Sequence, residues 1–319
     1  MTDPNASNMT DPNASGITNP KANELTDTKA HELTEPKAPG TTDPKAPIGI
    51  FDSGIGGLTV VKHLIDALPN ENIVYFGDTA RVPYGSKSND TVIEYSIQDA
   101  AFLMEFGVKA IVVACNTASS VALNQLRERF SVPIIGMIEP GAKYGLGYTS
   151  NDKIGVIGTR ATVNNKAYST KIAELDGQVT IIEQACPLFV PFAEEGWIDH
   201  PATRAVAAEY LKPLKDAGVD TLILGCTHYP ILKDVIKDEM GSNVKLVDSG
   251  IAASYAVVKE LTERGLLNPE NTPGDEIYYV SDIPATFSFV ASLFLGREII
   301  KINKVETDYI SSLFSMNKN

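Results

Sequence analysis

The 319-residue sequence contains only three cysteines and four histidines. So few cysteines do not form a disulfide framework, and we expect reduced thiols in a cytoplasmic protein. The scattered histidines lack the paired spacing of a zinc site, so we expect no metal. No apolar run approaches the ~18 residues of a membrane span, and the amino terminus lacks the basic and apolar regions of a secretory signal.

Basic residues are also scarce. The 27 Lys and Arg residues are outnumbered by 40 Asp and Glu residues, which gives a formal net charge of −13. This balance argues against nucleic acid and anionic membranes as partners, because no basic face is available to pair with phosphate. An acidic substrate would need a locally positive site, for example one made of backbone N–H groups at helix starts.

Residues 1–47 contain no aromatic side chain and repeat a unit of eight residues six times. The unit carries proline in most copies and almost no large apolar side chain. Such a segment cannot offset the entropy lost on ordering, so we expect residues 1–47 to be a disordered tail.

From residue 48 onward, short apolar runs alternate with helical patterns, and the order of these segments occurs twice. The expected strands are 48–51, 72–76, 110–114 and 132–137 in the first half, and 153–158, 180–183, 221–226 and 244–247 in the second. The repeat predicts an α/β fold of two similar lobes, each a mainly parallel sheet flanked by helices, related by a pseudo-two-fold axis with the active site between them. We assign residues 48–140 plus about 249–319 to the first lobe and 141–248 to the second.

Two cysteines occupy equivalent positions in the two halves. Cys115 follows the apolar run 110–114 and precedes a helical pattern, and Cys226 does the same after 222–225. Both are therefore expected at the carboxyl ends of strands, where open α/β sheets bind ligands. Helix N–H groups at such a position are expected to lower the pKa of the thiol. Cys186 has apolar neighbours, and we interpret it as structural.

Two thiols facing each other across a cleft suit the inversion of a stereocentre. One proton must leave one face of the carbon and another must arrive at the opposite face, which takes a base and an acid on opposite sides. A thiolate and a thiol can exchange these roles, whereas like-charge repulsion disfavours two thiolates in one small site.

Other polar residues are candidates for binding or proton transfer. His228 could hold or take the proton of Cys226, and Asp52 could do the same for Cys115 or bind a substrate ammonium. The turn 52–57 has G-x-G-G spacing rather than that of a dinucleotide loop, so we expect no nucleotide cofactor there. The loop around Tyr84 suits a carboxylate site lined by backbone, and we expect Arg81 to be solvated. Residues 186–196 are expected to form the matching loop of the second half.

The residues quoted so far carry a family resemblance. The segments 52–57 (DSGIGG), 83–85 (PYG), 115–118 (CNTA) and 225–230 (GCTHYP) resemble the glutamate racemase family of the cofactor-independent aspartate/glutamate racemase superfamily. The resemblance implies that Cys115 acts on the D-amino acid and Cys226 on the L-amino acid, and that Glu194 pairs with His228. It also implies substrate contacts from Asp52, Ser53, Tyr84, Gly85, Asn116, Thr117, Thr227 and His228.

The resemblance further implies an isomerase without a cofactor, commonly a homodimer, whose product D-glutamate feeds peptidoglycan synthesis. Three alternatives stay open. The chain could be a racemase of aspartate or another amino acid, or a hydrolase with Cys226 as nucleophile and His228 as base. It could also be a two-lobed amino-acid-binding protein whose thiols are incidental.

Overall fold

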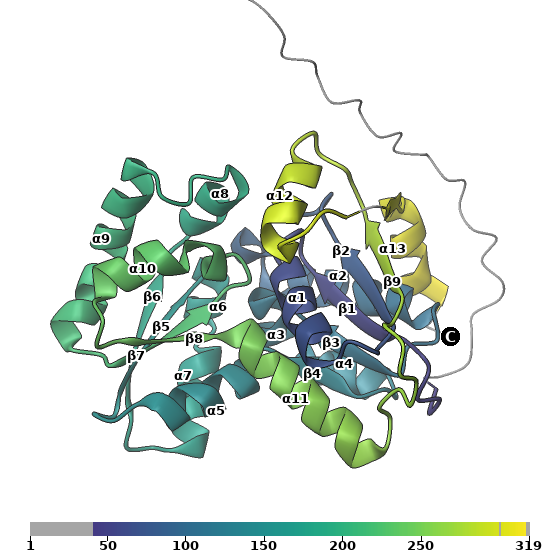
Figure 1. Ribbon diagram of the computed structural model, residues 1–319, viewed down its shortest axis with the longest axis horizontal. Helices are drawn as coiled ribbons and strands as arrows, with labels where there is room; N and C mark the ends of the chain where they lie inside the picture. The colour runs from purple at the N-terminus through teal and green to yellow at the C-terminus, as the bar shows by residue number, and fades with distance from the viewer. Residues whose placement is uncertain (1–40, 300, 317–319) are drawn as a thin grey trace, which may run out of the picture.

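A computed structural model describes residues 41–299 and 301–316 of the chain and shows two α/β lobes side by side (Figure 1). The first lobe holds a six-stranded sheet of order β10-β9-β2-β1-β3-β4, and the second a four-stranded sheet of order β6-β5-β7-β8. Every strand pair described is parallel. The strands are β1 (Ile48–Asp52), β2 (Ile73–Gly77), β3 (Ala110–Val113), β4 (Ile134–Gly136), β5 (Lys153–Gly158), β6 (Thr180–Ala185), β7 (Thr221–Gly225), β8 (Lys245–Asp248), β9 (Glu276–Val280) and β10 (Ile302–Lys304).

Helices cover both faces of each sheet. Those of the first lobe are α1 (Leu58–Ala67), α2 (Asn89–Met104), α3 (Asn116–Val121), α4 (Leu123–Arg129), α12 (Phe287–Leu295) and α13 (Thr307–Met316), with the 3₁₀ turn η1 (Tyr84–Ser86). Those of the second are α5 (Ile138–Tyr148), α6 (Arg160–Asn164), α7 (Ala167–Leu175), α8 (Phe189–Glu194), α9 (Pro201–Ala217) and α10 (Lys233–Met240), with η2 (Tyr229–Leu232). Helix α11 (Ser249–Arg264) packs against α1 and α5 and so joins the lobes.

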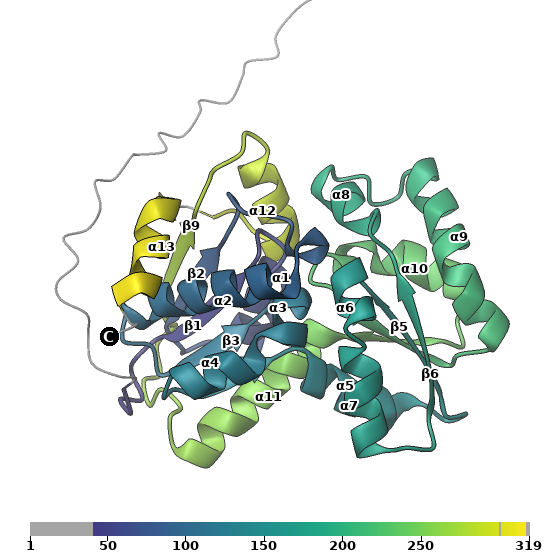
Figure 2. The ribbon, with the colours of Figure 1, turned by 180° about the vertical axis from the view of Figure 1, so that it is seen from behind.

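The four strands shared by the two lobes have the same order. The arrangement β2-β1-β3-β4 in the first sheet matches β6-β5-β7-β8 in the second. The central strands β1 and β7 are buried at every position, as expected where helices cover both faces of a parallel sheet. Helices α1 and α11 cover one face of the first sheet, and α2 and α4 cover the other, which Figure 2 shows from behind. The fold class expected from the repeated pattern is confirmed.

Hydrogen bonds at the carboxyl ends of the strands connect the lobes. The hydroxyl of Thr59 donates to the carbonyl of Thr227 at 3.0 Å. The hydroxyls of Thr117 and Thr159 lie 2.9 Å apart. These contacts hold the ends of β1, β3, β5 and β7 around one shared space.

The start of the described chain differs from the sequence-based expectation. Residues 1–40 lie outside the described part, but residues 41–47, which we expected to be disordered, contact the first lobe. The side-chain amide of Asn72 donates to the carbonyl of Lys45 at 2.9 Å. The Lys109 ammonium is fully buried and needs acceptors, and it takes the Pro44 carbonyl and the Glu71 carboxylate. Residues 41–47 are thus held against the first lobe by these contacts.

Two further observations concern segments of the described chain. Residues 186–196 are not a loop throughout, because α8 forms within them. Within residues 41–299 and 301–316, no helix is long and apolar enough to cross a membrane.

Candidate active site

A cavity of about 180 Å³ lies between the lobes, and both strand-end thiols line it. Its walls come from the segments that follow β1, β3, β5 and β7, together with η1 and the start of α8. The cavity is smaller than the 300–1,000 Å³ common for drug-sized ligands, so it fits a small metabolite. The lining residues are Ser53, Val82, Pro83, Tyr84, Gly85, Ser86, Cys115, Asn116, Thr117, Thr159, Arg160, Pro187, Val190, Pro191, Cys226, Thr227 and His228.

Cys115 is the residue immediately before α3, and it is held as a protonated thiol. Its Sγ accepts a hydrogen bond from the Ala118 N–H at 3.4 Å and donates to the Ser53 hydroxyl at 3.6 Å. Burial raises the pKa of Cys115 to about 12, and repulsion from the Asp52 carboxylate adds to this. The N–H of Ala118 acts in the opposite direction but is outweighed. The expectation of a lowered pKa was therefore wrong for Cys115, because desolvation exceeds the effect of the helix start.

Cys226 has a different environment, made of an imidazole and a carboxylate. The Sγ of Cys226 lies 3.9 Å from Nδ1 of His228, whose Nε2 lies 3.0 Å from Oε1 of Glu194. Burial disfavours the charged imidazole, but hydrogen bonds and charge from Cys226 and Glu194 outweigh it and raise the pKa of His228 to about 10. At neutral pH the imidazole beside the Cys226 sulfur is therefore protonated.

Two residues of the first lobe fix the His228 ring from the sides. Phe294 of α12 meets the ring edge-on, with centroids 5.1 Å apart and planes at 77°. Gly56 approaches so closely that a Cβ there would lie 2.4 Å from Nδ1 of His228. The orientation of this second-lobe imidazole thus depends on first-lobe residues.

Asp52 is not among the residues that line the cavity. Its carboxylate is fully buried. One oxygen accepts from the Gly54 N–H at 3.1 Å, and the other has no hydrogen-bond partner among the described residues. Burial raises the pKa of Asp52, while the charge of His228 and backbone N–H groups oppose this. A buried carboxylate oxygen without a partner is costly, and such groups concentrate at functional sites.

The hydroxyl of Tyr84 points away from the cavity. It lies within hydrogen-bond distance of Asp78 and, at 2.9 Å, of Asp99, and both carboxyl groups are fully buried. Arg81 pairs with the same two carboxylates, and its side chain is only 11% exposed. Our expectation of a solvated Arg81 was therefore wrong, because the two buried charges need a counter-ion. This cluster anchors the loop whose backbone, including Gly85, forms part of the cavity wall.

The other proposed substrate contacts lie at the cavity, partly engaged with one another. The amide of Asn116 accepts from the Tyr168 hydroxyl at 2.8 Å and donates to the Ser249 hydroxyl at 3.3 Å. Thr117 shares its hydroxyl with Thr159. Thr227 lies 3.4 Å from Nδ1 of His228. Each of these side chains therefore reaches the cavity already oriented by a hydrogen bond.

Several lining residues were not singled out by the sequence, notably Arg160, Pro187, Val190 and Pro191. The internal repeat carried a signal for one of them. Thr159 follows β5 as Ser53 follows β1, so Arg160 occupies the position equivalent to Gly54. Pro187, Val190 and Pro191 lie in the segment 186–196, which the repeat matched to the loop around Tyr84, but the individual contacts could not be predicted because α8 forms within that segment.

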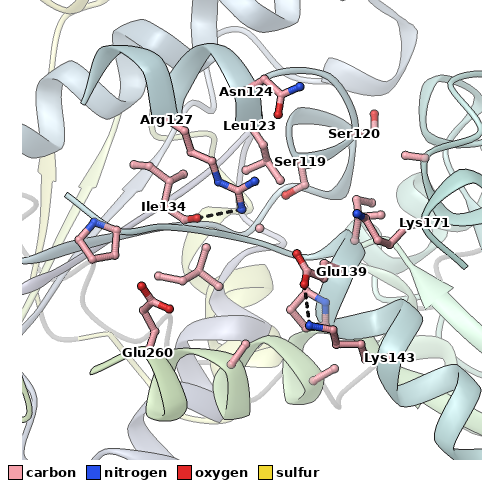
Figure 3. Close-up of a pocket in the computed structure, with 18 of the residues that line it drawn as sticks. Ser119, Ser120, Leu123, Asn124, Arg127, Ile134, Glu139, Lys143, Lys171 and Glu260 are labelled. Carbon is pink, nitrogen blue, oxygen red and sulfur yellow. Dashed lines mark hydrogen bonds and ion pairs between the residues drawn. The ribbon is translucent and has the colours of Figure 1, made fainter. Parts of the chain in front are cut away.

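A larger groove of about 1140 Å³ lies elsewhere, between α4, α5, α7 and α11 (Figure 3). Several of its charged side chains are engaged with one another or with backbone, as Lys143 is with Glu139 and Arg127 with the Ile134 carbonyl. None of the described thiols lines it. In the described part of the chain, no three His, Cys, Asp or Glu side chains are grouped to hold a metal ion. The smaller cavity is therefore the candidate active site.

Comparison with known proteins agrees with this assignment. The sequence profile of the family described as Asp/Glu/Hydantoin racemase matches residues 56–256, a stretch that covers more than half of the chain and includes both cavity thiols. The chain belongs to this racemase family.

Individual family members are similar over most of their length. A glutamate racemase from Geobacter metallireducens is 49% identical over 261 residues, covering 82% of this chain and 97% of that protein. One from Neisseria meningitidis serogroup A is 50% identical over 81% of this chain and 96% of that protein. The crystal structure of glutamate racemase from Francisella tularensis in complex with D-glutamate has a TM-score of 0.78 and 41% identity, covering 83% of this chain and 99% of that one.

Proposed function

We propose that the protein is a glutamate racemase that interconverts L- and D-glutamate by moving the α-proton between two thiols. The observation that carries this proposal is that Cys115 and Cys226, from equivalent positions of the two lobes, line one small cavity. Racemisation needs an acid and a base on opposite faces of the α-carbon, and the two lobes supply one sulfur each.

The two thiols have different surroundings. Burial keeps Cys115 as a thiol, and the protonated imidazole of His228 lies 3.9 Å from the Cys226 sulfur. Starting from L-glutamate, Cys226 takes the α-proton and Cys115 delivers a proton to the other face. In the reverse reaction Cys115 takes the α-proton of D-glutamate and Cys226 delivers a proton to the other face. Glu194 and His228 hold the proton that Cys226 delivers.

Neutral donors around the cavity suit a substrate with two carboxylates. Ser53, Thr117 and Thr227 present hydroxyls, and Asn116 presents an amide. The N–H groups of the loop at Tyr84 and Gly85 can bind a carboxylate without a cation. Asp52 is the candidate acceptor for the substrate ammonium or for the proton of Cys115, and because its carboxylate is fully buried, the ammonium reaches its unpaired oxygen only if the wall of the cavity rearranges on binding. Neither the substrate binding nor the proton transfer proposed for these groups requires a cofactor.

The substrate and the cellular role follow from the relatives. Those reported above are named glutamate racemases, and one was solved with D-glutamate. D-glutamate would supply peptidoglycan synthesis. A cytoplasmic location is consistent with three unpaired, buried cysteines. A homodimer is expected from the resemblance, and sedimentation of the full chain would test it.

One observation favours a second candidate, a cysteine hydrolase. The chain Glu194–His228–Cys226 has the order of an orienting acid, a base and a nucleophile. This mechanism would give no role to Cys115. A hydrolase would therefore tolerate Cys115→Ala, whereas a two-thiol racemase would not.

The deciding experiment incubates the protein with either glutamate enantiomer in D₂O and follows the α-proton by NMR together with optical rotation. If the protein racemises glutamate, deuterium from the solvent will appear at the α-carbon and the optical rotation will be lost. Cys115→Ala and Cys226→Ala should each lower the racemisation rate by at least about 10³-fold, since an acid/base group is lost on one face. Cys186→Ala removes the third thiol, which does not line the cavity, and should keep the rate. A Cys115→Ala or Cys226→Ala protein with near-normal turnover would refute the mechanism.

A further inference from the structure

The charge of the cavity wall is opposite to that of the protein as a whole. The chain carries a formal charge of −13. Among the described residues that line the cavity, there is no Asp or Glu, and Arg160 is the only Lys or Arg. The other charged lining side chain is the protonated imidazole of His228, which the mechanism already uses. An anionic substrate must therefore approach against an unfavourable overall field, and Arg160 supplies a local attraction.

Arg160 lines the cavity and is also exposed to solvent. It is the first residue of α6 and follows Thr159, and its side chain is exposed although it lines the cavity. It forms no hydrogen bond or ion pair with any other described residue. The arginines in the loop near Tyr84 and on α9 differ in this respect, because Arg81 and Arg204 are each paired with two carboxylates. The Arg160 guanidinium is thus free to pair with a ligand.

The position of Arg160 indicates which group of the substrate it can contact. The α-carbon must lie between the two sulfurs, so the α-carboxylate and ammonium stay close to them. Arg160 comes from α6, which packs against η1, whereas the two sulfurs come from the ends of β3 and β7. The substrate side chain is the part of the molecule that can extend from the reacting carbon toward α6.

We propose that Arg160 is a specificity-determining residue that attracts acidic amino acids to the cavity and pairs with their side-chain carboxylate. The inference rests on the proposed function and adds to it the group that selects an acidic side chain. Guanidinium–carboxylate pairs form charge-assisted and often bidentate hydrogen bonds, which are among the stronger polar contacts in proteins.

The test compares three variants with the wild type in the racemisation assay at low and high ionic strength. Arg160→Gln should raise the KM for both glutamate enantiomers roughly tenfold and leave kcat within about twofold, because a contact remote from the reacting carbon contributes equally to ground state and transition state. Arg160→Lys keeps the charge and should recover part of the affinity. The difference in KM between Arg160→Gln and the wild type should decrease as the salt concentration rises, since the Debye length falls from about 30 Å at 0.01 M to about 3 Å at 1 M.

Lys245→Gln is the matched control. It removes the same charge from an exposed residue of the same lobe, at the start of β8 and thus at the edge of the sheet away from the cavity. A KM of Arg160→Gln within twofold of that of Lys245→Gln would overturn the inference. A loss of kcat greater than tenfold would overturn the assignment to the side-chain carboxylate. A wild-type protein that does not racemise glutamate would instead refute the proposed function.

Discussion

Substituting Gly56 by alanine tests whether the position of His228 controls catalysis. The φ of Gly56 lies outside the left-handed region, so alanine can adopt this backbone. The new methyl group, however, would lie 2.4 Å from both His228 Nδ1 and Thr227 Oγ1. To reach an ordinary contact of 3.4 Å, these atoms must move by about 1 Å. Glu194 and Phe294 hold the imidazole on its other sides, so it cannot rotate away without losing those contacts.

The expected consequence is a large loss of activity with a modest loss of stability. A displacement of about 1 Å at a reacting group can cost about 10²-fold in rate. Overpacking of this kind typically costs about 1–3 kcal/mol of the free energy of unfolding. We therefore expect Gly56→Ala to fold, to unfold at a somewhat lower temperature, and to racemise glutamate about 100-fold more slowly.

The assay has an internal check and a control. The two enantiomers have equal free energies in water, so kcat/KM must fall by the same factor from L- and D-glutamate. Gly147→Ala in α5 adds a methyl group with nothing within 4 Å, and it should preserve activity and slightly increase stability. A Gly56→Ala protein that retains activity within threefold of wild type would show that the packing of this turn against His228 does not matter for catalysis.

Two further predictions concern the proton at Cys226 and the wall of the cavity. Glu194→Gln removes a carboxylate that raises the pKa of His228, so the imidazole should lose its proton at a lower pH. The alkaline limb of the kcat profile should then move from near pH 10 toward neutrality, and an unchanged limb would contradict the role of Glu194. Tyr84→Phe removes the hydroxyl shared by Asp78 and Asp99 and should lower the free energy of unfolding by about 1–3 kcal/mol in a urea titration. It should also raise KM more than kcat falls, whereas unchanged stability and KM would show that the hydroxyl does not anchor the loop.

The sequence by itself determined the strands and the position of the two thiols. Apolar, β-branched runs specify buried parallel strands locally, so the runs before Cys115 and Cys226 could be recognised without knowing what packs on them. The repeated order of segments predicted two lobes with equivalent strand ends, and the two sheets share that strand order. Both inferences depend on short-range patterns, which a sequence shows directly.

The electrostatic state of each site residue was decided only by the tertiary structure. The helix start near Cys115 suggested a lowered pKa, but burial by residues distant in sequence reverses the sign. Tyr84 looked available to a substrate, yet its hydroxyl is taken by Asp78 and Asp99. Desolvation and charge pairing depend on how closely atoms from distant segments approach, and no local pattern encodes those distances. The chain therefore specified which groups could react, and folding decided which of them carry a proton and which remain free to bind.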